Sequence, residues 1–303
     1  MFNNYYGEIF AILTSFCWTI SALSYEYAGK RIGSVPMNMI RMFIALGYMS
    51  LFLFITRGFI IPAHIPLNNW IWLLISGLIG FVVGDIMLFQ SFVVIGARLS
   101  MLVMSLVPPL AAIFGILLLK EKMSFFQVFA MFVTISGIAI VVYFGRRNHK
   151  NTEPIAKNLF KRLKGFLLAF GGAAGQAGGL VLSKKGMSGY DAFESTQIRI
   201  IAGVIGYIII ISSFKLWRKT FEGLKNKPAI GAVSLGSFIG PFIGVSFSLI
   251  ALKHTSAGIA ATLTSLAPVI IIYPSMLINK EKIKPFEVIG TIISIFGVAL
   301  FFL

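Results

Sequence analysis

The chain has 303 residues, of which 57% are hydrophobic and only 12% are charged. About a quarter of the residues of a soluble globular protein are charged, so this composition excludes a water-soluble fold; it also excludes a disordered chain, which needs low hydrophobicity. Cys17 is the single cysteine, which excludes a disulfide-stabilised scaffold. We therefore expect a membrane protein embedded in a lipid bilayer.

The chain has 26 Lys and Arg against 10 Asp and Glu, a surplus that could indicate nucleic-acid binding. However, no zinc finger, RNA-binding signature or basic helix stands outside the apolar segments. Cations in short loops explain the surplus, because they hold a membrane protein in its orientation. We expect no nucleic-acid partner and, since residues 1–7 contain no Lys or Arg, no cleavable signal peptide.

Ten continuous apolar segments are long enough to cross a membrane as helices. A β-barrel is excluded, because its strands would alternate apolar and polar residues. In chain order, the expected spans are residues 7–28, 35–56, 70–94, 98–119, 125–144, 165–183, 195–214, 228–252, 256–278 and 285–303. The sequence thus predicts an all-α, multi-pass protein of the plasma or inner membrane with ten transmembrane helices.

Residues 145–164 differ from the rest of the chain, because they hold seven Lys and Arg. This basic linker separates two halves of five expected spans each, residues 7–144 and 165–303. The spacing of Phe160, Leu163 and Leu167 fits a short amphipathic helix on the membrane surface, and a solvated linker fits equally well.

The two halves repeat one another at an offset of 160 residues. Ser105-Leu106-Val107-Pro108 corresponds to Ser265-Leu266-Ala267-Pro268, and Lys120-Glu121-Lys122 corresponds to Lys280-Glu281-Lys282. The matched glycines are Gly80 and Gly240, Gly84 and Gly244, and Gly137 and Gly297. Chance could match Leu and Ile in apolar segments, but it would rarely match these motifs at one constant offset.

Each half has an odd number of expected spans, so the second half must enter the membrane in the opposite sense. Inverted repeats related by a pseudo-two-fold axis in the membrane plane are typical of secondary transporters, whose halves exchange conformations. A receptor or a membrane enzyme has no such reason for an inverted duplication.

The spans with Pro108 and Pro268, each followed by Lys-Glu-Lys, resemble the EamA-type repeat of the drug/metabolite transporter superfamily. In that family, the last helix of a repeat opens with a Gln/Glu-x-x-Gly pattern. Glu287-Val288-Ile289-Gly290 matches this pattern, whereas Gln127-Val128-Phe129-Ala130 departs from it by one alanine. Gly84-Asp85, followed by Ile95-Gly-Ala97, is also similar to one branch of the family.

The resemblance covers about residues 7 to 303. It implies a basket of ten helices around a central cavity that exports or exchanges small metabolites, such as amino acids. No motif is specific for one substrate, and the oligomeric state stays open.

The distribution of positive charge predicts the orientation. Alternate loops hold 18 Lys and Arg on the side of the basic linker and 6 on the other side. The positive-inside rule therefore places the linker in the cytoplasm and both termini outside. The family resemblance implies the opposite, with both termini in the cytoplasm, and we favour the charge count.

Asp85 is the most unusual residue, because it lies well inside the third expected span. A carboxylate there costs about 2.5–3.5 kcal/mol on insertion scales, so it must pair, face a wet cavity or stay protonated. Each of these suits a proton-coupling or cation-recognition group, and a structural acid nearer the interface is the alternative. Its counterpart is Val245, so the fold does not require the acid.

Arg41 and Arg199 occupy matching places early in the second and seventh expected spans. They are candidates to line the substrate pathway and attract anionic groups. The alternatives are snorkelling to the lipid headgroups or a structural pair with Asp85 or Glu194.

Two polar stripes lie on the first and sixth expected spans, which are repeat counterparts and are candidates to wall the cavity. Ordinary helix packing explains them equally well. The stripes are Thr14, Trp18, Ser21 and Tyr25 on the first span and Gly172, Gln176, Gly179 and Ser183 on the sixth. Trp18, Tyr25 and Gln176 are the pathway candidates among them.

The mid-span prolines Pro108 and Pro268 are expected to bend their helices, because proline removes a backbone donor. The series Gly171-Gly175-Gly179 and Gly236-Gly240-Gly244 are expected to let helices approach closely.

Catalysis has little support in the sequence. The three histidines have no metal-ligand spacing, and neither a P-loop nor a Gly-x-Ser-x-Gly motif is present. We therefore expect no enzyme, no metal and no cofactor, and a secondary active transporter of small molecules driven by a solute or proton gradient. The alternatives are a flippase of a lipid-linked sugar or isoprenoid carrier, and a membrane enzyme or sensor.

Overall fold

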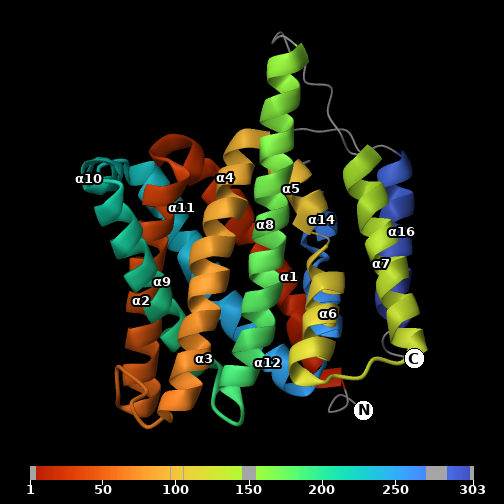
Figure 1. Cartoon of the computed structure of the whole chain (residues 1–303), viewed down its shortest axis with the longest axis horizontal. Helices are drawn as coiled ribbons and strands as arrows, with labels where there is room; N and C mark the ends of the chain where they lie inside the picture. Colours follow the sequence, from red (N-terminus) through yellow and green to blue (C-terminus); the bar gives the residue numbers. More distant parts are fainter. Residues whose placement is uncertain (1–4, 96, 105, 145–154, 271–284, 301–303) are drawn as a thin grey trace.

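The computed structural model of the protein describes residues 5–95, 97–104, 106–144, 155–270 and 285–300. Ser105, Pro274, the Lys280-Glu281-Lys282 turn and residues 145–154 of the basic linker lie outside the described residues. Within the described ranges, every regular element is a helix, which confirms the all-α class (Figure 1).

The helices of the first half are α1 (Tyr6–Ile32), α2 (Ser34–Arg57), α3 (Leu67–Gly77), η2 (Leu78–Gly84), α4 (Asp85–Ile95), α5 (Ala97–Met104), α6 (Val107–Leu119) and α7 (Phe125–Phe144). Those of the second half are α8 (Ile155–Met187), α9 (Ala192–Ser213), α10 (Trp217–Leu224), α11 (Lys227–Ser237), η3 (Phe238–Gly244), α12 (Val245–His254), α13 (Ala257–Thr264), α14 (Ala267–Ile270) and α16 (Pro285–Leu300). The segments η2 and η3 are π-helical.

Within the described residues, 6 helical runs are long and apolar enough to cross a membrane. They are Tyr6–Ile32, Ser34–Arg57, Leu67–Ile95, Leu163–Met187, Ala192–Ser213 and Lys227–His254. The other four expected spans fall on α5–α6, α7, α13–α14 and α16, which are interrupted or have shorter apolar stretches. Helix length and hydropathy therefore support six of the ten expected crossings.

Corresponding helices of the two halves run in opposite directions. In Figure 1, α1 begins at the lower edge of the view, whereas its counterpart α8 begins at the upper edge. Likewise, α7 runs upward and its counterpart α16 runs downward beside it. The described helices thus have the antiparallel relation that the odd number of spans per repeat predicts.

The π-helical segments occupy the same place in both halves, which the sequence analysis did not predict. Each lies between two α-helical segments of one run, η2 between α3 and α4, and η3 between α11 and α12. Gly80 and Gly84 lie in η2, and Gly240 and Gly244 lie in η3. Hydropathy patterns cannot separate an i→i+5 from an i→i+4 helix, whereas short π-segments are frequent at functional sites.

The glycines of η2 allow close packing against α8. A Cβ atom added to Gly175 would lie 2.7 Å from the Cα atom of Gly84, and one added to Gly179 would lie 2.9 Å from the Cα atom of Gly80. The two helices therefore touch backbone to backbone, as expected for a small-residue interface in a membrane protein.

The glycines of η3 make the equivalent contact with α1. A Cβ atom added to Gly240 would lie 3.0 Å from the Cβ atom of Ser21, and one added to Gly244 would lie 2.9 Å from the Cβ atom of Cys17. This contact is repeated in both halves, so the repeat seen in the sequence extends to the packing.

The last helices of the two halves, α7 and α16, pack on each other through a reciprocal contact. Gly137 of α7 faces Ser294 of α16, and Gly297 of α16 faces Thr134 of α7. The Thr134 hydroxyl donates to a carbonyl of its own helix at 2.9 Å, and the Ser294 hydroxyl does so at 2.8 Å. This arrangement has the local two-fold relation expected of duplicated elements.

Helix α8 begins at Ile155 rather than near residue 165. Phe160 and Leu163 lie on this extension of α8, Leu167 follows it on the same helix, and all three side chains are exposed. The amphipathic segment is therefore the first part of the long helix and not a separate helix in the plane of the membrane surface.

Both proline-containing spans are interrupted close to the proline. Helix α5 ends at Met104 and α6 begins at Val107; α13 ends at Thr264 and α14 begins at Ala267. Pro108 lies at the start of α6, where the backbone donor that it lacks is not needed. Pro108 thus stands at the start of a new helical segment, and Pro268 holds the matching place in α14. The bend expected at these prolines stays a prediction.

Candidate functional site

A cavity of about 150 Å³ lies between the two halves of the chain. This is about the size of an engineered cavity that takes up benzene. Most of its wall is apolar or aromatic, contributed by Ala22, Tyr25, Phe81, Leu88, Phe89, Phe92, Met101, Met104, Val107, Leu180, Val245, Ala261 and Ala267 together with Trp18. The polar lining residues are Ser21, Gln176, Arg199, Ser248, Thr264 and Ser265.

Both helix interruptions border this cavity. Met104 and Val107 come from the α5–α6 break, and Thr264, Ser265 and Ala267 come from the α13–α14 break. Interrupted helices in membrane proteins occur where the backbone lines a cavity, because the freed polar groups need a polar environment.

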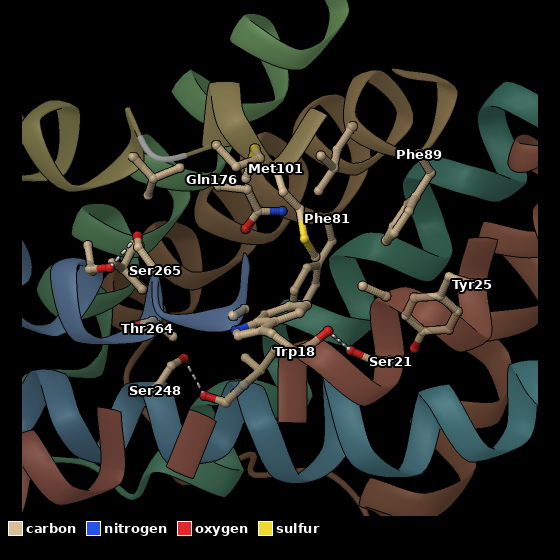
Figure 2. Close-up of a pocket in the computed structure, with 18 of the residues that line it drawn as sticks. Trp18, Ser21, Tyr25, Phe81, Phe89, Met101, Gln176, Ser248, Thr264 and Ser265 are labelled. Carbon is tan, nitrogen blue, oxygen red and sulfur yellow. Dashed lines mark hydrogen bonds between the residues drawn. The ribbon is translucent and has the colours of Figure 1, made fainter. Parts of the chain in front are cut away.

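Trp18 lies in the middle of the lining residues shown in Figure 2, with Tyr25 and Phe89 to one side and Ser248, Thr264 and Ser265 to the other. The Trp18 indole N–H has no hydrogen-bond acceptor among the described residues. Trp18 therefore offers the cavity an aromatic face and a free donor.

The serine and threonine hydroxyls of the cavity donate to their own helices. Ser248 donates to the Val245 carbonyl at 2.7 Å, and Ser265 donates to the Ala261 carbonyl at 2.8 Å. Their oxygen atoms can still accept a hydrogen bond from a ligand. Ser265 belongs to a repeated motif and could have been selected from the sequence, whereas no sequence signal marks Ser248.

Asp85 and Arg41 form an ion pair behind the cavity wall. The Arg41 Nη2 atom donates to Asp85 Oδ2, and the side chains are 0% and 1% exposed. This geometry is the structural pair considered from the sequence, and it corrects the snorkelling alternative for Arg41, because the guanidinium does not reach the surface. Neither residue lines the cavity.

Aromatic rings complete the surroundings of Arg41. Its guanidinium lies 5.3 Å from the centroid of the Tyr25 ring and 5.0 Å from that of Phe89. Both rings line the cavity, so they separate the ion pair from it. Cation–π contacts of this kind stabilise a guanidinium that water cannot reach.

Gln176 connects the ion pair with the cavity. Its Nε2 atom donates to Asp85 Oδ1 at 2.5 Å, and its side chain lines the cavity. An ionised carboxylate only accepts hydrogen bonds, which assigns the amide nitrogen to this contact and leaves the amide oxygen as a free acceptor.

Arg199 lines the cavity but has no carboxylate partner within ion-pair distance among the described residues. Its guanidinium lies 4.7 Å from the centroid of the Phe81 ring, and its Nε atom is buried without a hydrogen-bond partner. Arg199 does not form the ion pair with Glu194 that the sequence analysis considered. Glu194 contacts Arg57 and His64 instead.

The cavity therefore brings together Trp18, Tyr25, Gln176 and Arg199, while Arg41 and Asp85 lie just behind it. Pro108 belongs to a helix that borders the cavity but is not one of its lining residues. No group of three or more His, Cys, Asp or Glu residues that could hold a metal occurs within the described ranges.

Glu121, from the first Lys-Glu-Lys turn, lies outside the cavity and joins three segments. Its carboxylate is 2.7 Å from Lys184 Nζ on α8 and accepts the backbone N–H of Ala257, at the start of α13, at 3.0 Å. Lys184 also donates to the Thr255 carbonyl at 2.6 Å. The first Lys-Glu-Lys turn thus has a packing role.

Comparison with known proteins gives one family. A model of the EamA-like transporter family matches residues 5–143 and again residues 163–303. "Solute carrier family 35 member G1" of Homo sapiens is 23% identical over 219 residues, which are 72% of this chain and 58% of that protein. The chain therefore spans little more than half of the length of the human relative.

A bacterial relative and a solved structure are similar over more of their length. "Uncharacterized transporter YyaM" of Bacillus subtilis (strain 168) is 24% identical over 257 residues, 84% of this chain and 80% of that protein. A solved crystal structure that is 16% identical in sequence matches with a TM-score of 0.70, and the match covers 97% of this chain and 94% of the chain in that structure. At this identity, the likeness shows a shared fold.

Proposed function

Since the chain belongs to the EamA-like transporter family, we propose that this multi-pass membrane protein is a secondary active transporter that exports or exchanges a small metabolite. The observation that carries the proposal is the cavity bordered by both interrupted helices, one from each repeat. Such a site between repeats is where secondary transporters bind substrate.

Ten membrane crossings follow from the same proposal. The crossings α5–α6 and α13–α14 are interrupted at the cavity, and α7 and α16 form an antiparallel pair beside the bundle (Figure 1). With five crossings in each repeat, both termini lie on one side of the membrane. The charge count places that side outside the cytoplasm.

The driving force is the gradient of the substrate or of protons. Proton coupling would act through Asp85, which must then exchange its ion pair with Arg41 for a proton during the cycle. Asp85→Asn tests this role. If pH-driven transport by the variant matches the wild type, Asp85 has a structural role only.

The alternative substrate is a lipid-linked sugar or isoprenoid carrier. The described cavity is small and has polar groups spread over its wall, which favours a small metabolite over a polyprenyl chain. A flippase would need a groove that opens laterally to the lipid.

Metabolite release tests the function. Cells with the protein and cells with an empty vector would be grown in parallel, and metabolites would be quantified in the medium and in the cells. We expect at least one compound to redistribute only with the protein, and purified protein in liposomes to exchange that compound. No redistribution in either direction, together with flipping of a labelled lipid carrier in the liposomes, would replace the proposal with the flippase alternative.

A further inference from the structure

The charges at the cavity do not balance. Arg41 and Asp85 neutralise each other behind the wall, so this pair contributes no net charge. Arg199 is 3% exposed, lines the cavity, and has neither an ion pair nor a side-chain hydrogen bond with any described residue. Two guanidinium groups therefore accompany one carboxylate, which leaves a single positive charge at the cavity.

Within the described part of the chain, no other acid neutralises this charge from the cavity side. Among the described residues, no carboxylate lines the cavity. Five other described acidic side chains have basic partners elsewhere: Glu26 with Lys30, Glu121 with Lys184, Asp191 and Glu194 with Arg57, and Glu222 with Arg218. Glu8 has no basic partner among the described residues, but it does not line the cavity. Asp85 also acts on Arg199 electrostatically, but its carboxylate is already committed to Arg41 and Gln176.

The repeat explains where the missing carboxylate would be. Arg41 and Arg199 hold matching places, because each is the eighth residue of its helix, α2 or α9, and the counterpart of Asp85 at the offset of 160 residues is Val245. Val245 lines the cavity, whereas Asp85 does not. The position that supplies a carboxylate in the first repeat is thus apolar in the second and faces the space that a ligand would fill.

An unpaired guanidinium in a water-poor interior is costly, and one aromatic ring at 4.7 Å offsets only part of that cost. An anion in the cavity would remove the imbalance through a charge-assisted hydrogen bond, which is stronger where the dielectric constant is low. The aromatic and aliphatic wall would meanwhile bury an apolar body.

We propose that the cavity binds an organic monocarboxylate with an apolar body, and that Arg199 pairs with its carboxylate as Arg41 pairs with Asp85. The Trp18 indole and the Phe81 ring contact the apolar body. This inference rests on the proposed transport function and names its substrate class.

A comparison of charge forms tests the inference on the unmodified protein. The purified full chain in detergent would be titrated calorimetrically with 3-phenylpropionate, its neutral amide and the cation phenethylamine. We expect the carboxylate to bind at least about tenfold more tightly than the amide, the effect of one charge-assisted hydrogen bond. Equal binding of the three probes, or no binding of the carboxylate, overturns the inference.

Variants at the second-repeat position sharpen the test. Val245→Asp supplies Arg199 with an internal carboxylate, so we expect the preference for 3-phenylpropionate over its amide to disappear. Val245→Asn has nearly the same shape without the charge, so a preference should persist even if both affinities fall. Persistence of the full preference in Val245→Asp overturns the assignment of Arg199.

Substitution of Arg199 itself provides a second route. Arg199→Gln should remove the preference and Arg199→Lys should restore much of it, whereas Arg218→Gln, on a side chain 91% exposed, should leave it unchanged. Only variants with a wild-type gel-filtration profile would be compared. If metabolites redistribute in cells but the carboxylate preference is absent, the inference fails while the transport function stands; if neither is observed, both fail.

Discussion

Arg41 and Arg199 occupy corresponding positions of the two repeats, yet among the described residues Arg41 has a carboxylate partner and Arg199 has none. Arg41 pairs with Asp85 out of reach of the cavity, and Arg199 faces the cavity beside Phe81. The backbone follows the repeat closely, whereas the charges do not. Two symmetric repeats allow two alternating conformations. A charge in only one of the repeats, that of Arg199, allows a ligand with one charged end to bind in a single orientation.

Removal of Asp85 is expected to destabilise the protein more than removal of the whole ion pair. Asp85→Asn leaves the Arg41 guanidinium buried without its counter-charge, which costs about 3–5 kcal/mol. Arg41→Met combined with Asp85→Leu removes both charges and should cost less, because no buried charge then lacks a partner. Thermal unfolding of the purified variants in detergent would measure both. A double variant that unfolds as early as the sum of the single ones would show that the two residues are not coupled.

The contact between η2 and α8 is expected to tolerate no side chain at Gly175. A Cβ atom there would lie 2.7 Å from the Cα atom of Gly84, so Gly175→Ala must push two backbones apart. We expect a loss of about 1–3 kcal/mol, the usual cost of overpacking. Gly178→Ala on the same helix is the matched control, because its nearest neighbour would be 3.6 Å away. Equal melting temperatures for the two variants would contradict the backbone contact.

The ion pair between Glu121 and Lys184 is expected to contribute modestly and in a salt-dependent manner. The two side chains are 12% and 25% exposed, so solvent screens them only in part. Glu121→Gln removes the charge but keeps an acceptor for the Ala257 N–H, and we expect a loss of about 1 kcal/mol at low salt. The loss should shrink in high salt, where charges are screened. Lys122→Gln on the exposed part of the same turn should have no such effect, and a salt-independent loss in Glu121→Gln would point to packing instead of charge.

The orientation can be read with two fusions at Leu303. The charge count predicts that alkaline phosphatase fused there is active outside the cytoplasm and that a fluorescent protein, which folds only in the cytoplasm, stays dark. The opposite result would show that the charge count failed and that the orientation implied by the family resemblance is correct. A second pair of fusions within residues 145–154 should give the reverse pattern.

The membrane class, the duplication and the family follow from the sequence by itself. Hydropathy is a sum over neighbouring residues, and a repeat is a constant offset, so neither requires knowledge of contacts between distant segments. The same reasoning placed Arg41 and Arg199 at matching positions and selected Asp85 as the unusual acid. It could not select the partner of Asp85, because local pattern does not show which of the two arginines, Arg41 or Arg199, lies beside this carboxylate.

Tertiary structure decided which charge is neutralised and which faces the ligand space. Asp85 meets Arg41 across 44 residues of sequence and Gln176 across 91. Such meetings depend on how helices cross, and small differences in rotation of a helix move a side chain from the cavity to the protein interior. Asp85 and Val245 each begin the α-helix that follows a π-helical segment, and a hydropathy pattern does not encode such a segment. Val245 is the clearest example. The sequence marks it only as the counterpart of Asp85, whereas the structure shows that it lines the cavity.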